Sequence, residues 1–530
     1  MTCKGKLAAC AAALAIVTAV AAAAEAPPDG MAVAMHAVSR GDGIAAEIAV
    51  AKAVDAGRPR REVAATMGEA LLLQERLADA RQWLAPARFA PSSRQRGYHA
   101  LARLELAEQN YAAAARAFNH ALASGTPEAG IWVDIGAMRY RSGEQRLALD
   151  AATRALTIDP RDPAALSFRA QLVRDADGPA AALPWYERAI QQAPDDLGLL
   201  AGYAQSLGDA GRSRDMLAVA RRMVEIDPRD PRAYVLQAVL AARAGEFALA
   251  RRLLWKTRDT YDDTPSGLLI NGILELADGS AALAVEHFDA LLRVQPENRL
   301  ARHLLARALL ANGEPNEVIA RFGPAADRAH AAPYLQAIVG RAYEHRGDRV
   351  AGALYLERAG APSDDTLAVL PVDDAGDFFI WQREKDGGGL QGAVPALRRL
   401  IARHRFAEAR GEAAALRARY PHSTDVDRLV GDVALLTGDA REAAAAFGDA
   451  AKVRTDDALM VRRFYADRAL GRDPMPQLNA FLRGSPRSAS AWRVRGWWEN
   501  RANDETGEDR LERRGHTMLV IRRIVEQSGA

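Results

Sequence analysis

Apolar residues in this 530-residue chain recur every three to four positions, the spacing that places them along one face of an α-helix. The amphipathic segments come in pairs, and the pairs repeat. The hexapeptide Ile-Asp-Pro-Arg-Asp-Pro occupies 158–163 and returns at 226–231, a shift of 68 residues, or twice 34. A fixed period of this length is typical of helical repeat proteins. The pattern therefore predicts an all-α solenoid of antiparallel helix pairs, because one pair alone cannot bury its apolar face.

Small residues define the register of these repeats. When each repeat is numbered from 1 to 34, position 8 is Ala or Gly in ten successive repeats. These repeats begin at Pro27, Arg61, Gln95, Ala129, Pro163, Leu197, Pro231, Pro265, Arg299 and Pro333. A small residue at position 8 lets the first helix approach the small residue at position 20 of the second, as for Gly136 and Ala148. A bulky residue at position 24, such as Phe288, is expected to fill the space beside that contact.

The turns between repeats carry their own signals. Proline at position 32, as at Pro160 and Pro194, is expected to end the second helix because it lacks an N–H and clashes with the preceding turn. An Asp-rich turn follows and supplies a side-chain cap for the next helix, as at Asp162.

This spacing resembles the tetratricopeptide repeat family. The repeat that begins at Ala129 has Trp132 at position 4, Gly136 at 8, Ala148 at 20, Ala155 at 27 and Pro160 at 32. The resemblance covers nearly the whole chain after residue 24 and implies a right-handed superhelical solenoid with a concave binding groove. It implies a protein or peptide partner without identifying one, since such repeats serve many partners.

The register divides the chain into five parts. We predict a signal peptide at 1–24, a ten-repeat solenoid at 25–366, an insert at 367–389, further repeats at 390–488 and C-terminal capping helices at 489–530. The insert breaks the register and ends in three glycines, which disfavour a helix. A hinge, a decayed half-repeat and a loop that contacts the partner all fit this segment.

The first 24 residues have the features of an export signal. Lys4 and Lys6 precede an uncharged apolar run, and Ala22–Ala24 fits a cleavage site for small residues. The interpretation is an exported protein of the periplasm or cell envelope, with an uncleaved membrane anchor as the alternative. Both cysteines, Cys3 and Cys10, lie in this segment, so the mature chain would have no disulfide. No later stretch is apolar and long enough to cross a bilayer.

Composition and motifs argue against nucleic-acid binding and catalysis. The formal charge of +2 includes Lys4 and Lys6, so residues 25–530 sum to zero, which disfavours bulk electrostatic binding to nucleic acid. The sequence has no P-loop, no G-x-S-x-G elbow and no H-E-x-x-H. Its ten histidines are scattered without a metal-ligand spacing. We therefore predict a protein that is not an enzyme and needs no cofactor or metal.

The resemblance also implies where a partner would bind. Positions such as 2, 5, 9, 12 and 13 of the first helix would line the concave groove. The arginines at these positions include Arg103, Arg141, Arg174, Arg243, Arg307, Arg341, Arg398, Arg428 and Arg462. Acidic residues at the same positions are fewer, so a neutral chain would hold a basic inner face suited to carboxylates of a peptide or of an acidic polysaccharide. An arginine-rich composition that places arginine at every exposed position is the alternative.

Two functions remain open from the sequence. The first is a non-catalytic exported scaffold that holds an envelope protein in its concave groove. The second is an assembly subunit for export of envelope polysaccharide or outer-membrane components.

Overall fold

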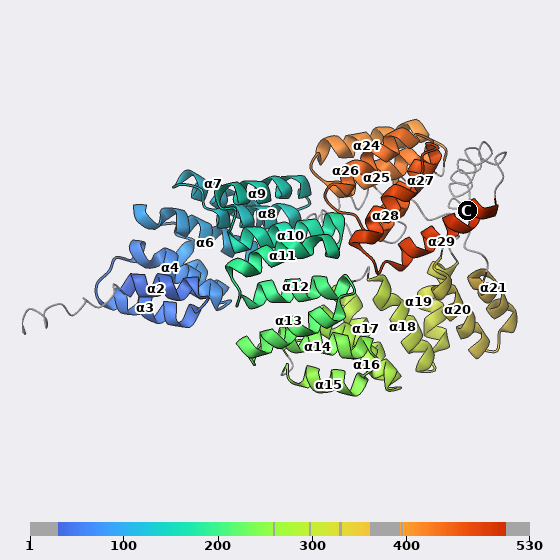
Figure 1. Cartoon of the computed structure of the whole chain (residues 1–530), viewed down its shortest axis with the longest axis horizontal. Helices are drawn as coiled ribbons and strands as arrows, with labels where there is room; N and C mark the ends of the chain where they lie inside the picture. The colour runs from blue at the N-terminus through green and yellow to red at the C-terminus, as the bar shows by residue number, and fades with distance from the viewer. Residues whose placement is uncertain are drawn as a thin grey trace, which may run out of the picture. The chain divides into compact units, whose positions relative to one another are not determined.

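The computed structural model describes residues 30–504, except 258–259, 296–297, 328–330, 361–392, 394–395, 398 and 402. The side chains of 299, 489, 493, 497 and 500–504 are also outside the description. The predicted signal peptide, insert and last 26 residues, 505–530, therefore lie outside the described residues. Every regular element in the described ranges is a helix (Figure 1).

The chain divides into two compact units, residues up to Ile135 and residues from Gly136 onward, with the boundary inside helix α8. The first unit contains α2 (Gly30–Ser39), α3 (Gly43–Asp55), α4 (Arg60–Leu73), α5 (Leu77–Leu84), the 3-10 helix η1 (Pro91–Ser93), α6 (Arg94–Ala107), α7 (Tyr111–Ala123) and the start of α8 (Ala129–Arg141).

The second unit continues with two groups of helices. Those before the insert are α9 (Gln145–Ile158), α10 (Pro163–Asp177), α11 (Pro179–Gln192), α12 (Leu197–Asp209), α13 (Ser213–Ile226), α14 (Pro231–Arg243), α15 (Phe247–Trp255), α16 (Pro265–Ala277), α17 (Ala281–Val294), α18 (Arg299–Ala311), α19 (Pro315–Ala326), α20 (Pro333–His345) and α21 (Arg349–Gly360). Those after it are α24 (Phe406–Arg419), α25 (Thr424–Leu436), α26 (Ala440–Ala451), α27 (Asp457–Ala469), α28 (Met475–Gly484) and α29 (Ala489–Asp504), which we call the C-terminal module.

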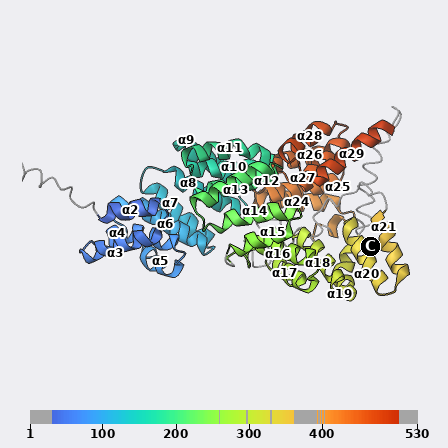
Figure 2. The ribbon, with the colours of Figure 1, turned by 60° about the horizontal axis from the view of Figure 1, so that its bottom comes forward.

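Consecutive helices pack as antiparallel pairs within each unit, as Figure 2 shows for α10 with α11 and α20 with α21. The expected all-α solenoid of helix pairs is confirmed. The register is confirmed as well, because the predicted starts at Ala129, Pro163, Leu197, Pro231 and Pro265 are the first residues of α8, α10, α12, α14 and α16. The predicted caps form, and the side chain of Asp162 accepts a hydrogen bond from the Ala165 N–H at 2.7 Å.

Positions 8 and 20 lie in the core of the ten repeats before the insert. All ten residues at position 8 are buried, from Ala34 to Gly340. Position 20 is equally closed, with Ala46, Ala148 and Ala284 each fully buried. Position 20 carries a larger residue in two repeats, Met216 and Val318, and these are also buried, at 2% and 0% exposure. The small residues thus set the distance between paired helices.

The residue at position 24 fills the space beside position 8, as expected. In one repeat, where position 24 is small, a residue of the next repeat fills this space instead. A β-carbon added at Gly272 would lie 2.6 Å from the ring of Phe288, the residue at position 24 of the same repeat. In the repeat that begins at Ala129, position 24 is the small Ala152. The ring of Phe168, from the first helix of the next repeat, fills the space instead and lies 2.4 Å from a β-carbon placed on Gly136. A cavity left by one repeat is therefore filled by its neighbour.

A turn feature that the apolar pattern did not predict joins the two helices of a pair. Position 15 adopts a positive φ in repeat after repeat, and it is usually glycine, as at Gly143 with φ 81° and Gly347 with φ 84°. Glu75, Gln109 and His404 take the same conformation at the same position. Glycine reaches this region without the steric cost that a side chain brings.

Replacing Gly136 with leucine tests the interrepeat contact. The new side chain would collide with the Phe168 ring, and overpacking of this kind costs about 1–3 kcal/mol of unfolding free energy. We expect Gly136→Leu to lower the urea midpoint, with faster amide exchange confined to α8, α9 and α10. Gly130→Leu is the matched control, because a β-carbon at Gly130 has no atom within 4 Å. Equal stability of the two variants would contradict this account of the packing.

Candidate partner-binding groove

The first helix of each repeat carries the predicted groove arginines. Of the described ones, Arg103 lies on α6, Arg141 on α8, Arg174 on α10, Arg243 on α14, Arg307 on α18 and Arg341 on α20. Arg398 lies outside the described residues. The side chains of the six described arginines are exposed except that of Arg174, which is half-buried.

In the first unit, one carboxylate joins two neighbouring first helices. The His99 ring Nε2 lies 2.7 Å from the Asp134 carboxylate, and the Arg103 guanidinium lies 3.8 Å from the same oxygen. Arg103 is therefore partly neutralised by a residue of the next repeat.

In the second unit, Asp209 has the corresponding role between three repeats. Its carboxylate accepts a hydrogen bond from Arg174 at 3.1 Å and lies 3.8 Å from the guanidinium of Arg243. Arg243 also donates to the Gly208 carbonyl at 3.4 Å. Two predicted groove arginines thus converge on one acid, and the group keeps a net positive charge.

These contacts follow a rule that sequence reasoning missed. A polar residue at position 12 meets an aspartate at position 13 of the next repeat, 35 residues later, in Tyr140 with Asp175 and in Arg174 with Asp209. Burial, with help from the Asp175 charge, raises the pKa of Tyr140 far above its ordinary value, so its hydroxyl stays a donor. The signal was present in the sequence as a polar residue and an aspartate at this 35-residue separation.

Two predicted arginines remain exposed without an ion pair to any described residue, namely Arg141 and Arg307. Arg341 is paired along its own helix, with 2.7 Å between its guanidinium and Glu344. Near Arg307 in the register, the rings of His303 and Tyr334 lie 5.4 Å apart on the first helices of adjacent repeats. The basic character of this face therefore resides in fewer side chains than the sequence implied.

The inner face of the C-terminal module is closed. Arg462, which the register placed in the groove, is 8% exposed and donates to buried Asp432 at 2.7 Å. Arg428 donates to Asp456 at 2.9 Å, and Asp425 at position 2 is only 1% exposed. For Arg428 and Arg462 the groove interpretation was wrong, because these largely buried side chains pair with carboxylates within the module, half-buried Asp456 and buried Asp432.

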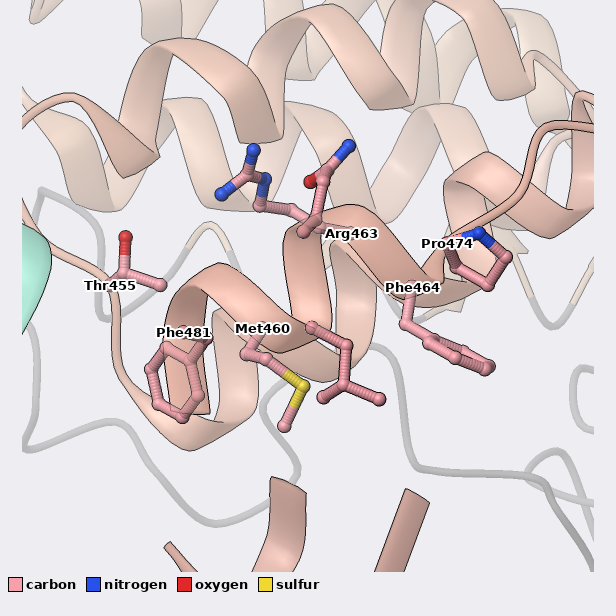
Figure 3. A pocket seen from close by; sticks show the side chains of 8 residues that line it. Thr455, Met460, Arg463, Phe464, Pro474 and Phe481 are labelled. Atoms are coloured by element: carbon pink, nitrogen blue, oxygen red, sulfur yellow. The ribbon is translucent and has the colours of Figure 1, made fainter. Parts of the chain in front are cut away.

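A small hollow between α27 and α28 is a second place to look for a ligand (Figure 3). Its walls are mostly apolar, with Met460, Phe464 and Phe481 turned toward it and Arg463 at the rim. Burial lowers the pKa of the Arg463 guanidinium, with Asp467 opposing the shift. This arrangement offers no pair of groups for acid–base chemistry, so we assign it to packing.

Neither a metal site nor a membrane-spanning helix is found within the described ranges. No group of three or more His, Cys, Asp or Glu side chains among the described residues is arranged to hold a metal ion. Among the same residues, no helix combines the length and the hydropathy needed to cross a lipid bilayer.

Comparison with known proteins gives the family. The model of the tetratricopeptide repeat matches residues 99–163 and 271–317. These two segments of the chain are tetratricopeptide repeats. The chain is 29% identical over 136 residues to the TPR repeat-containing protein YpiA of Bacillus subtilis, covering 25% of this chain and 32% of YpiA. It is 28% identical over 251 residues to the Cellulose synthase 2 operon protein C of Komagataeibacter xylinus, covering 42% of this chain and 19% of the relative.

Two solved structures are similar to this chain at low TM-scores. A tetratricopeptide repeat protein from Parabacteroides merdae matches with a TM-score of 0.32 and 15% identity, covering 44% of this chain and 91% of that one. The Cut9–Hcn1 hetero-tetramer of the APC/C matches with a TM-score of 0.35 and 14% identity. The match covers 88% of this chain and 95% of that chain. The match to the tetratricopeptide repeat model indicates a repeat scaffold suited to protein interaction.

The ion pair at Asp456 gives a pH-dependent test of how the inner face of the module is held. Although burial of the carboxyl opposes ionisation, Arg428 and Arg454 outweigh it and lower the pKa of Asp456 from 3.8 to about 2. The carboxylate therefore stabilises the fold above its ordinary pKa, and this stabilisation disappears as pH falls through the folded-state value.

Asp456→Asn removes the charge but keeps an acceptor for the Leu459 N–H that Asp456 caps at 2.8 Å. We expect it to lower the unfolding free energy by about 1–2 kcal/mol at pH 7 and by progressively less between pH 4 and 2. Urea unfolding at pH 7 and at pH 3 measures the difference, with exposed Asp150→Asn as the control. A difference that stays constant over this range would contradict a charge effect.

Proposed function

We propose that this tetratricopeptide repeat protein is an exported, non-catalytic scaffold that holds an envelope protein against the first-helix face of its repeats. The observation that carries the proposal is the pair of exposed arginines, Arg141 and Arg307, on that face. Neighbouring arginines pair with Asp134, Asp209 and Glu344, whereas Arg141 and Arg307 form no ion pair with a described residue and are exposed to a partner. A planar guanidinium matches a carboxylate, which favours an acidic segment of the partner.

Export is part of the same proposal and rests on the sequence of residues 1–24. A mature chain without cysteine would suit an oxidising envelope compartment. N-terminal sequencing of the protein from its native host would test this, and retention of Met1 would contradict it.

A second candidate function is supported by one comparison. The relative from Komagataeibacter xylinus is named for a cellulose synthase operon, which favours a role in assembling a polysaccharide export system. Under this alternative, deleting the gene should reduce secreted polysaccharide, and the purified protein should bind an acidic polymer such as polygalacturonate.

The groove is tested by reversing the two exposed arginines together. Arg141→Glu with Arg307→Glu should reduce recovery of the partner in an envelope pull-down by tenfold or more, with an unchanged helical circular dichroism signal. The reason is that each change replaces an attraction by a repulsion at the inner face. The effect should be largest at low salt, where exposed charges are least screened.

A matched control comes from the second helix of a repeat. Arg214 and Arg221 lie exposed on α13, so Arg214→Glu with Arg221→Glu makes the same change of charge away from the first-helix face. Equal loss of capture in both double variants would show a general charge effect. Undiminished capture by the groove variant would overturn the proposal.

A further inference from the structure

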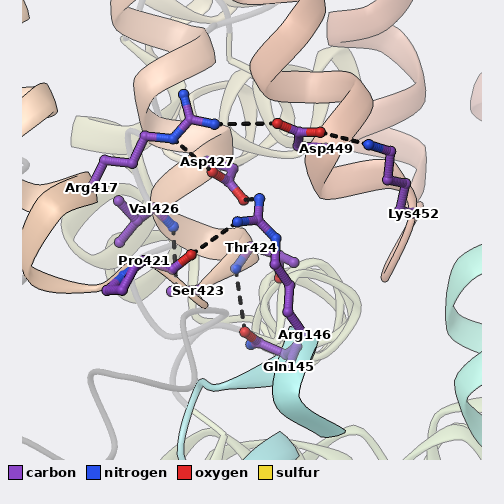
Figure 4. A network of polar contacts seen from close by, with 10 residues as sticks. All are labelled: Gln145, Arg146, Arg417, Pro421, Ser423, Thr424, Val426, Asp427, Asp449 and Lys452. Carbon is purple, nitrogen blue, oxygen red and sulfur yellow. Dashed lines mark hydrogen bonds and ion pairs between the residues drawn. The ribbon is translucent and has the colours of Figure 1, made fainter. Parts of the chain in front are cut away.

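The C-terminal module makes contacts with a distant part of the same unit. Arg146, in the first turn of α9, donates to the Pro421 carbonyl at 2.9 Å and pairs with Asp427 of α25 (Figure 4). Its own N–H donates to the His422 carbonyl at 3.4 Å. Beside it, the Gln145 side chain accepts a hydrogen bond from the Thr424 N–H at 3.3 Å.

The next two turns of the module repeat this contact one repeat further along. The Thr455 N–H donates to the Asp175 carbonyl at the end of α10, with 2.7 Å between the atoms. Arg487 then donates to the Gly208 carbonyl at the end of α12, at 3.1 Å. The turns that precede α25, α27 and α29 in the module thus face the turns that follow α8, α10 and α12. The contact is therefore a repeat-by-repeat match between two turn edges.

Glycine permits the closest point of this match. A β-carbon on Gly484, the last residue of α28, would lie 1.7 Å from the Asp177 carbonyl oxygen. A β-carbon on Gly178 would lie 2.5 Å from the Gly484 carbonyl carbon, and Gly178 also has φ +92°. Two backbones can approach this closely only when neither residue carries a side chain.

The contacts described above between the module and the turn edge are hydrogen bonds and one ion pair. Asp427 is 2% exposed on its side chain, while Arg146 keeps 31% of its side chain exposed and so remains open to screening by salt. When two polar surfaces separate, water forms hydrogen bonds with the groups that had paired across the contact. Water does not compensate in this way for apolar surface that becomes exposed. Contacts of this type between parts of one chain allow relative motion.

We propose that the turn edge formed by residues 142–146, 175–178 and 208–211 is a docking surface whose partner is the C-terminal module of the same chain. The module docks through its turns at 421–427, 455 and 484–487 and separates from the edge as a folded body. The docked module reaches the candidate groove, because the Gly208 carbonyl that accepts from Arg487 also accepts from Arg243.

Gly484→Ala tests the docking without changing any charge. Gly484 lies in a helix without a positive φ, so alanine suits the module itself but collides with the Asp177 carbonyl of the docked state. We expect the Thr455 amide to exchange at least tenfold faster than in the wild type, because its acceptor is the Asp175 carbonyl across the contact. Gly448→Ala on α26 is the control, since a β-carbon there has no atom within 4 Å.

Arg146→Gln tests the charged part of the contact by the same readout. Its control is Arg410→Gln, because Arg410 pairs with Asp439 and Glu442 inside the module. We expect faster exchange at Thr455 in Arg146→Gln, and also in wild-type protein when salt is raised, but not in Arg410→Gln.

Amides inside α26 report whether the module stays folded. In both docking variants we expect them to keep wild-type protection, which is the mark of separation as a folded body. Loss of protection in α26 together with Thr455 would overturn the proposal, since the module would then need the edge in order to fold. Fast exchange of Thr455 in the wild type, or wild-type exchange in Gly484→Ala, would overturn it as well.

Discussion

The close approach of two helices at one small residue is the constraint on which the rest of this protein depends. Position 8 is buried in all ten repeats before the insert, and position 20 faces it from the second helix. Any extra volume there must displace a ring or a backbone, as the Phe168 ring against Gly136 illustrates. Because a solenoid repeat packs chiefly on its neighbours, this one contact, repeated, sets the spacing at which the surface side chains of the repeats are presented.

That spacing decides what the arginines do. First helices of neighbouring repeats lie close enough for residues 35 positions apart to meet, as His99 does with Asp134 and Arg174 with Asp209. Arginines that look available in the sequence are therefore divided between holding repeats together and facing a partner. Exposed ion pairs of this type add little stability, about 0–1 kcal/mol each. Their larger consequence is that the charge of the inner face is concentrated at positions such as Arg141 and Arg307.

Polar residues are also used where the chain contacts itself across a long sequence separation. Helix α25 is buried on nearly all sides although Asp425, Asp427 and Asp432 lie on it. Arg146 reaches one of these carboxylates from the other end of the unit, and Arg462 reaches another from the neighbouring helix. Buried carboxylates require such partners, since an unpaired buried charge is strongly destabilising. The turn edges fit together because glycine occupies the point of closest approach.

The sequence by itself determined the repeat. Ala and Gly at position 8, proline at position 32 and the capping aspartates placed the starts of α8, α10, α12, α14 and α16 at the correct residue, because helix pairing and capping depend on residues close together in the chain. The sequence also indicated that the candidate groove residues lie on the first helix of each repeat. Only the tertiary structure decided which arginines are occupied, and that Arg428 and Arg462 are buried in ion pairs rather than presented to a partner. The meeting of Arg146 with Asp427, 281 residues apart, was equally invisible, because a contact between distant turns depends on how the stacked repeats bring their edges together and leaves no period in the sequence.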